Sequence, residues 1–342
     1  MTRTTPTPGD TASSSPEALE ERLAEIRRNV TGLREEIAAT FLGHSNALDL
    51  LLQTLFAGGH ALLEGAPGLG KTTLVKAAAR SLDLDFQRIQ FTPDLMPADI
   101  LGARILEETP GGGHSFRFEK GPLFTQVVLA DEINRATPRT QSALLEAMGE
   151  RQITIYGESF HLAEPFFVIG TQNPIEMEGT YPLPEAQLDR FLCRIDLENP
   201  SQSDLERILS HTTGSQAAEI HATLCRDDVL AIRALVREIP ASNEVITRVA
   251  RLIRATDPRN PDAPERVRRL LRCGASPRGG QAVLLLAKAR ALIAGRPFVS
   301  DEDLDAVVRP ALRHRLVLGY EAEATGLHPD ELVDEAWEAA RE

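Results

Sequence analysis

The sequence has few cysteines, few aromatic residues and no long apolar run. Its three cysteines, Cys193, Cys225 and Cys273, lie far apart and match no metal-binding motif, so we expect buried, reduced thiols in a cytoplasmic protein. No stretch is long enough to span a bilayer and no signal peptide is visible, so we expect no membrane segment. No zinc finger, helix-turn-helix or basic strand platform with aromatic residues is present, which disfavours specific nucleic-acid recognition.

The chain also lacks an excess of positive charge. Its 37 basic and 50 acidic residues give a formal net charge of −13. A negatively charged protein repels phosphate backbones in general, although a local basic patch could still bind one. We therefore expect no specific nucleic-acid partner.

A phosphate-binding loop is the clearest positive feature. The pattern G-x-x-x-x-G-K-[ST] follows a short apolar run at 61–64 and precedes a segment rich in helix formers at 73–80, the context that such a loop requires. Lys71 can reach the β- and γ-phosphates, and the Thr72 hydroxyl can hold Mg²⁺. A chance glycine turn is the weaker alternative. The residues predicted to bind nucleotide are Gly65, Ala66, Pro67, Gly68, Leu69, Gly70, Lys71, Thr72 and Thr73.

Two further apolar runs end in polar residues suited to the same site. Residues 127–130 are followed by Asp131 and Glu132, where the first can bind Mg²⁺ and the second can take a proton from attacking water. Residues 166–170 lead to Asn173, which can orient that water or sense the γ-phosphate. Alone, the first pattern could be a strand that exits to a polar turn, and the second an Asn-Pro turn.

Two arginines are candidates for the charge that develops on the transferred phosphate. Arg190 lies between a helical stretch and a strand, so it can act across a subunit interface, or it can be a surface ion-pair residue. Arg278 opens a helix in the second half of the chain, where it can close over phosphates or simply start the helix.

The chain divides into three regions. Residues 1–16 read as a disordered tail because they are rich in Thr, Pro and Ser, with one Gly and almost no apolar content. Residues 17–199 alternate strands with helices, which predicts an α/β domain with a parallel sheet, whereas residues 200–342 read as helices alone. We place the boundary near residues 199–201.

Together these motifs resemble an AAA+ ATPase, and more narrowly the MoxR family. The runs at 90–102, 131–136, 141–148 and 184–191 are nearly continuous with that family's pattern. The resemblance implies a P-loop AAA+ α/β fold with a five-stranded parallel sheet of order 5-1-4-3-2, flanked by helices, and a C-terminal all-α lid domain. It implies ATP and Mg²⁺ as cofactors, with Lys71, Thr72, Asp131 and Glu132 in the Walker motifs. It also implies Asn173 as sensor 1, Arg190 as arginine finger, Arg278 as sensor 2, and base contacts near Gly43 and His44.

The resemblance also implies inserts and partners. Residues 95–118 match an insert that interrupts the second helix, and residues 151–164 match a hairpin before sensor 1; their alternating pattern independently supports that hairpin. The family implies a homo-oligomeric ring, commonly a hexamer. It further implies chaperone-like remodelling of a partner protein, a von Willebrand factor A-domain protein. The alternatives are a nucleic-acid motor of the same clade and a nucleotide-gated scaffold without turnover.

Overall fold

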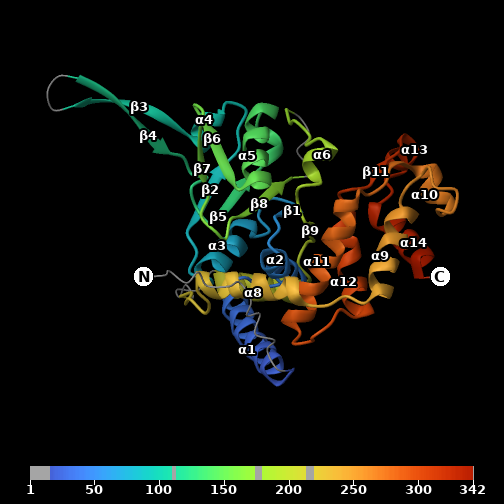
Figure 1. Cartoon of the computed structure of the whole chain (residues 1–342). Coiled ribbons are helices and arrows are strands. Elements are labelled where there is room, and N and C mark those ends of the chain that lie inside the picture. Colours follow the sequence, from blue (N-terminus) through green and yellow to red (C-terminus); the bar gives the residue numbers. More distant parts are fainter. Residues whose placement is uncertain (1–15, 110–112, 174–178, 213–218, 342) are drawn as a thin grey trace, which may run out of the picture.

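The computed structural model describes residues 16–109, 113–173, 179–212 and 219–341. Nearly all of the predicted tail lies outside the described residues, as do positions 110–112 of the predicted insert. Figure 1 shows a sheet covered by helices and, beside it, a group of helices from the C-terminal part of the chain.

A five-stranded sheet lies at the centre of the α/β part. Its order is β2-β5-β8-β1-β9, and all neighbouring strands are parallel. With these strands renumbered one to five along the chain, the order read from β9 is 5-1-4-3-2, which confirms the predicted fold. The strands are β1 (Ala61–Gly65), β2 (Phe86–Gln90), β5 (Val127–Asp131), β8 (Phe167–Gln172) and β9 (Cys193–Leu197).

Successive strand residues enter two separate cores. In β1, Ala61 and Leu63 pack on one face and Leu62 packs on the other. Helices α1 (Pro16–Thr40), α2 (Ser45–Phe56) and α3 (Lys71–Ser81) complete the first core, and α5 (Pro138–Glu150) completes the second. Because both faces are covered, the central strands β1, β5 and β8 can be apolar almost without interruption, whereas the edge strands β2 and β9 also carry polar residues.

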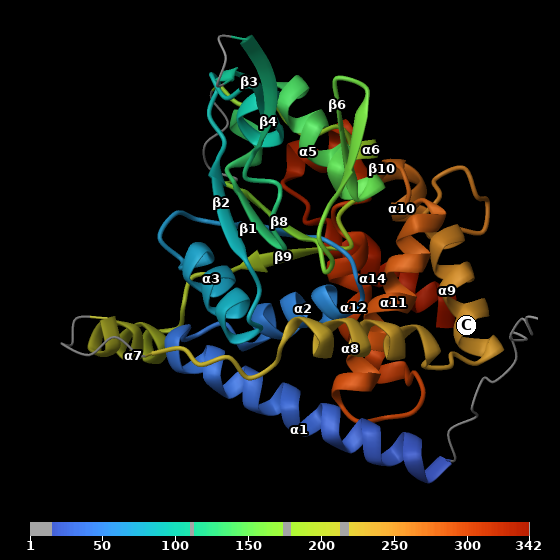
Figure 2. The same ribbon diagram turned by 60° about the vertical axis from the view of Figure 1, so that its left-hand side comes forward.

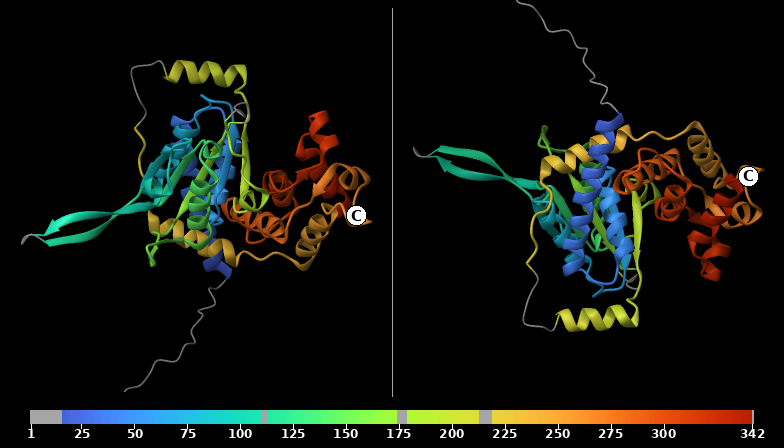
Figure 3. Two further views of the ribbon diagram at one scale, coloured as in Figure 1. Left: turned by 90° about the horizontal axis from the view of Figure 1, so that it is seen from above. Right: turned by 90° about the horizontal axis from the view of Figure 1, so that it is seen from below.

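Two antiparallel hairpins occupy the predicted inserts. The first follows the short helix α4 (Pro97–Leu101) and joins β3 (Gly102–Thr109) to β4 (Gly113–Lys120). The second joins β6 (Gln152–Ile155) to β7 (Glu158–His161). Figures 1 and 3 show that β3 and β4 extend far from the body of the protein.

The base of the β3–β4 hairpin packs against the β6–β7 hairpin as far as its turn. The Phe118 and Phe160 rings stack with centroids 4.7 Å apart. Arg104 pairs with Glu158 at 2.7 Å, and its guanidinium lies 4.9 Å from the centre of the Tyr156 ring. Aromatic stacking and a cation–π contact therefore join segments that are about 40 to 50 residues apart in sequence.

The C-terminal part is helical, with one small strand pair that the sequence analysis did not anticipate. Strands β10 (Leu271–Cys273) and β11 (Val317–Leu318) are too short to show a period, and their pairing is non-local. The six-residue helix α10 (Glu265–Leu270) directly precedes β10. The other helices are α7 (Gln202–Thr212), α8 (Arg226–Glu238), α9 (Asn243–Ala255), α11 (Pro277–Ile293), α12 (Asp301–Leu312), α13 (Tyr320–Thr325) and α14 (Pro329–Arg341). Two short helices in the α/β part complete the description, η1 (Ile133–Arg135) and α6 (Glu185–Leu188).

Helix α8 packs against both the α/β part and the lid helix α11, and α7 lies beside the phosphate loop. Figure 2 shows α8 running between α1 and α2, and Arg233 on α8 donates a hydrogen bond to the carbonyl of Leu55 at 2.8 Å. Helices α9 to α14 pack beside the sheet edge formed by β9 (Figure 1). The C-terminal helices thus contact the nucleotide-binding strands directly.

The expectation of buried thiols is wrong for two of the three cysteines. Cys193 is buried on β9, where its sulfur lies 3.1 Å from the Thr54 hydroxyl, and burial raises its pKa to about 11. Cys225 is exposed as the N-cap residue of α8, and Cys273 is exposed on β10. Both lie at the ends of elements, where the helical surroundings read from the sequence do not enclose a side chain.

Candidate nucleotide-binding site

The phosphate loop connects β1 to α3 through two glycines in the left-handed region. Gly68 has φ 84° and Gly70 has φ 79°, values that strain any residue with a Cβ. Gly70 is also the N-cap residue of α3, so the free N–H groups of the first helical turn face the loop. The loop therefore combines inward N–H groups with the positive end of a helix, which suits phosphate.

Lys71 lies between this loop and the neighbouring strand. Its Nζ donates to the Gly65 carbonyl at 2.7 Å and lies 3.4 Å from the Gln172 carbonyl. Burial lowers the pKa of Lys71, while the charges of Asp131 and Glu132 oppose that shift. The ammonium thus lies near the acidic residues at the end of β5, and the half-buried Thr72 follows it on the same helical turn.

The Asp131 carboxylate is held from both neighbouring strands. Thr171 on β8 donates its hydroxyl to Oδ1 at 2.6 Å. Arg88 on β2 donates to Oδ2 from Nε at 3.0 Å and from Nη2 at 2.6 Å. Because the carboxylate is buried, these bonds fix its orientation at the end of the strand.

Glu132 is held in a strained backbone conformation beside it. Its φ is 56°, and its N–H donates to the Thr171 hydroxyl at 2.8 Å. Its Oε2 accepts from Gln90 at 2.8 Å and from Arg135 at 2.9 Å. A left-handed non-glycine residue held by several partners is typical of a functional position.

Three residues of this arrangement were not assigned from the sequence: Arg88, Gln90 and Thr171. Arg88 and Gln90 are two residues apart on β2 and therefore share one face. The available signal was this pair of polar side chains on a strand whose buried residue, Ile89, lies between them. Thr171 gave no separate signal, because its role depends on the pairing of β8 with β5.

The predicted phosphate-site residues come together at the carboxyl ends of the central strands. Asn173 follows β8 directly and is 6% exposed. Since β8 lies between β1 and β5, Asn173 lies between the phosphate loop and the acidic pair. The carboxyl ends of parallel strands are where α/β proteins bind ligands.

A cavity of about 550 Å³ adjoins the phosphate loop. The His44 ring stacks on Phe41 with centroids 5.6 Å apart, and burial lowers the pKa of His44. Gly43 has φ 91°, so the chain turns sharply into this wall. The cavity is lined by the junction of α1 and α2, by residues 67–70 and by Leu205 and Ile208 of α7, a mostly apolar set that suits a planar base.

These residues fit a nucleotide with its magnesium ion. The loop conformation, the helix end and Lys71 suit the phosphates, and the oxygens of Thr72 and Asp131 are the hard ligands that Mg²⁺ prefers. The cavity beside residues 67–70 has room for the base.

Arg190 lies at the opposite end of the strands, on the side where β1 and β9 begin. It precedes β9, which runs parallel to β1 and pairs Cys193 with Ala61 at the start of both strands. The phosphate loop begins where β1 ends, and five residues of strand span about 16 Å. Arg190 donates instead to the Leu145 carbonyl of α5 at 2.7 Å.

Arg278 lies at the same end as Arg190. It is exposed on the first turn of α11, where Ser276 caps the helix by accepting from the Arg278 N–H. Its Nη1 is 4.0 Å from Asp189 Oδ2, and Asp189 directly precedes Arg190. The structure therefore groups the two arginines with each other and separates Arg190 from the phosphate loop of its own chain.

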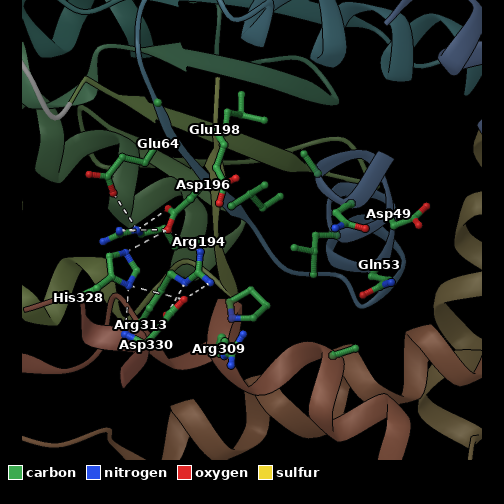
Figure 4. Close-up of a pocket in the computed structure, with 18 of the residues that line it drawn as sticks. Asp49, Gln53, Glu64, Arg194, Asp196, Glu198, Arg309, Arg313, His328 and Asp330 are labelled. Atoms are coloured by element: carbon green, nitrogen blue, oxygen red, sulfur yellow. Dashed lines mark hydrogen bonds and ion pairs between the residues drawn. The ribbon is translucent and has the colours of Figure 1, made fainter. Parts of the chain in front are cut away.

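A second cavity, of about 840 Å³, lies between the sheet and the lid helices α12 and α14 (Figure 4). A chain of ion pairs crosses it. Arg194 bonds Glu64 at 2.8 Å and Asp196 at 2.8 Å. Arg313, after α12, bonds Asp196 at 2.5 Å and Asp330 at 2.7 Å. Because Glu64 directly precedes the phosphate loop, this chain connects the loop to the lid.

Glu64 and His328 lie at the two ends of that network. Burial raises the pKa of Glu64, and the charge of Arg194 opposes the shift. His328 Nε2 is 3.9 Å from Asp196 Oδ2, and its Nδ1 is 3.7 Å from Asp330 Oδ2. Figure 4 shows the His328 ring directed toward these carboxylates.

Fold and site define an AAA+ ATPase, and comparison with known proteins agrees. A model of the ATPase family associated with various cellular activities matches residues 60–193, and one of the AAA lid domain matches residues 263–336. A Cytophaga hutchinsonii crystal structure assigned as an ATPase superposes with a TM-score of 0.87 at 36% identity, covering 94% of this chain and 97% of that one. The family binds and hydrolyses nucleotide.

Sequence relatives narrow the class. Chaperone MoxR1 of Mycobacterium tuberculosis is 39% identical over 87% of this chain and 78% of its own length. Protein MoxR of Methylorubrum extorquens is 31% identical over 90% of this chain and 94% of its own. YeaC of Bacillus subtilis, uncharacterised, is 39% identical over 90% and 92%. The chain belongs to the MoxR family of AAA+ ATPases. Among the described residues, no helix is both long and apolar enough to cross a membrane.

Proposed function

We propose that this protein forms a ring in which ATP is hydrolysed between subunits to remodel a partner protein. The observation that carries the proposal is the separation of Arg190 from Lys71 and Glu132. Arg190 lies where the strands begin, and the other two residues lie where the strands end. One chain cannot bring these groups to the same phosphate. A head-to-tail arrangement, which closes into a ring, can place the Arg190 end of one subunit against the phosphate loop of the next.

Each residue then has a defined task. The loop N–H groups and Lys71 hold the phosphates, while Thr72 and Asp131 hold Mg²⁺. The ion supplies positive charge next to the phosphates when it is bound. Glu132 accepts the proton of the attacking water, and Asn173 orients that water.

The neighbouring subunit completes the site. Arg278 lies near Asp189, the residue before Arg190, so both arginines serve the nucleotide of the adjacent subunit, where they neutralise charge on the transferred phosphate. The side chain of Arg190 needs only to leave the Leu145 carbonyl to become free. His44 and Leu205 of α7 enclose the base within the same chain, and Gly43 makes the turn that leads into this wall.

The client is a second part of the proposal. We propose a hexamer that acts on a von Willebrand factor A-domain protein, as the resemblance to the MoxR family implies; the similarity to a protein named Chaperone MoxR1 supports a chaperone role. The two hairpins are joined at Phe118 and Phe160. They can therefore move as one unit and pass motion from the ATP site to a client.

A mixing experiment tests action between subunits. Glu132→Gln keeps its arginines and loses its base, whereas Arg190→Ala keeps its base and loses the finger. Each variant alone should bind ATP and not turn it over. In an equal mixture, about one quarter of the interfaces combine an intact base with an intact arginine. Turnover should therefore recover to about one quarter of the wild-type rate. Arg151→Ala is the control, since Arg151 lies at the end of α5, the helix whose Leu145 carbonyl Arg190 contacts, but pairs with the exposed Glu164.

The outcomes separate the parts of the proposal. Full turnover by Arg190→Ala alone would exclude Arg190 as the finger, and no recovery in the mixture would exclude action between subunits. Mass measurement in Mg·ATP gives the number of subunits. Capture from lysate with Glu132→Gln in Mg·ATP, with Lys71→Ala as control, tests the client: a protein without the proposed domain, held only by the first bait, would contradict that assignment.

A further inference from the structure

The Asp131 carboxylate has a cationic partner on β2. Arg88 donates to Oδ2 through both Nε and Nη2, while Thr171 donates to Oδ1. The exposed fractions of the side chains are 47% for Arg88 and 12% for Asp131. The pair therefore joins a buried acid to an arginine that reaches solvent.

Arg88 also has a second anchor on its own strand. Its Nη2 lies 2.6 Å from Gln90 Oε1, and Gln90 in turn bonds Glu132. If the bonds to Asp131 are broken, the guanidinium can remain on Gln90 and in solvent. Since it is about half exposed, losing one carboxylate leaves no buried charge unpaired on the arginine side.

The geometry makes Arg88 and a metal ion rivals for one oxygen. Oδ2 already accepts two charge-assisted hydrogen bonds, and Oδ1 accepts one from the buried Thr171. A divalent cation, or a water molecule of its first shell, needs a lone pair on the same carboxylate. In addition, the positive charge of the guanidinium raises the free energy of a second cation placed beside it.

We propose that Arg88 sets the Mg²⁺ concentration at which the nucleotide site fills, because it competes with the ion for Asp131. The proposal rests on the assignment of Asp131 as the metal residue in the proposed function. Arg88 is thus a positioning residue: it acts through Asp131 and does not itself touch the substrate.

The test is a Mg²⁺ titration of fluorescent ATP binding at a fixed protein concentration. Because Arg88 is about half exposed, solvent weakens its charge, and loss of this charge is worth about 1 kcal/mol, so Arg88→Gln should lower the half-saturating Mg²⁺ concentration by about fivefold. Arg88→Lys keeps the charge but loses the planar two-nitrogen contact, so its shift should be in the same direction and smaller. Arg266→Gln is the matched control, because Arg266 is 43% exposed and pairs with Glu331 in the lid. It should leave the titration unchanged.

The outcomes are distinct. An unchanged or higher half-saturating concentration in Arg88→Gln would overturn the proposal, since Arg88 would then only brace Asp131. If Arg88→Gln does not fold, Arg88→Lys decides in the same way. Failure of the wild type to bind ATP, or binding that Lys71→Ala does not weaken, would instead refute the proposed function.

Discussion

Arg313 should hold the lid to the nucleotide-binding sheet. It lies after α12, is 13% exposed, and bridges Asp196 on β9 to Asp330 on α14. Arg313→Ala would leave two half-buried carboxylates facing each other without their shared cation. The Arg194 guanidinium would still neutralise Asp196 from the other side, at 2.8 Å.

The expected magnitude follows from this burial. Removing one partner of a fully buried pair costs about 3 to 5 kcal/mol, and exposed pairs are worth about 0 to 1 kcal/mol. The carboxylates are 24% and 21% exposed, and Arg194 compensates one of them. We therefore expect Arg313→Ala to reduce the free energy of unfolding by about 2 kcal/mol.

Arg309→Ala is a matched control, because Arg309 lies in the last turn of α12, four residues before Arg313. Arg309 also makes a two-nitrogen contact with one carboxylate, Asp334, but is 55% exposed, so its loss should cost about 0.5 kcal/mol. Urea unfolding followed by circular dichroism measures both variants. Limited proteolysis should cleave between β9 and α12 sooner in Arg313→Ala only. Equal unfolding midpoints for the two variants would refute the reasoning that burial makes the Arg313 bridge the stronger one.

Two further predictions follow from buried groups. Thr171→Val removes the hydroxyl that bonds Asp131 and the Glu132 N–H, so it should lower ATP turnover and cost about 1 to 3 kcal/mol of stability; Thr54→Val, equally buried but bonded to Leu50 in α2, should lose stability with unchanged turnover. Equal turnover losses in both would contradict this. His60 accepts from the Val168 N–H, and burial lowers its pKa to about 4. The unfolded chain binds this proton below about pH 6.5 and the folded protein does not, so stability should fall by about 3 kcal/mol as pH drops from 7 to 4. The melting temperature should change less with pH in His60→Gln than in the wild type. If this variant kept the wild-type slope, another group would be the cause of the pH dependence.

The sequence by itself determined the local features of this protein. The phosphate loop is contiguous, and its glycines, Lys71 and Thr72 act through one turn of backbone, so their spacing alone predicts the site. The central strands β1, β5 and β8 are largely apolar because both of their faces are covered, which made them recognisable, whereas 193–197 alternates buried residues with Arg194 and Asp196. The hairpin around Tyr156 and Gly157 followed from alternation and turn residues. The order of the strands came from the family resemblance.

Only the tertiary structure decided which distant residues share an environment. Arg88 and Thr171 meet Asp131 because β2 and β8 flank β5, a register that no local pattern encodes. Arg190 lies away from its own phosphate loop because β1 and β9 run parallel, so the start of one strand cannot reach the end of the other. Hydrogen bonds and ion pairs between strands depend on distances across the sheet, whereas a sequence motif reports only neighbours along the chain.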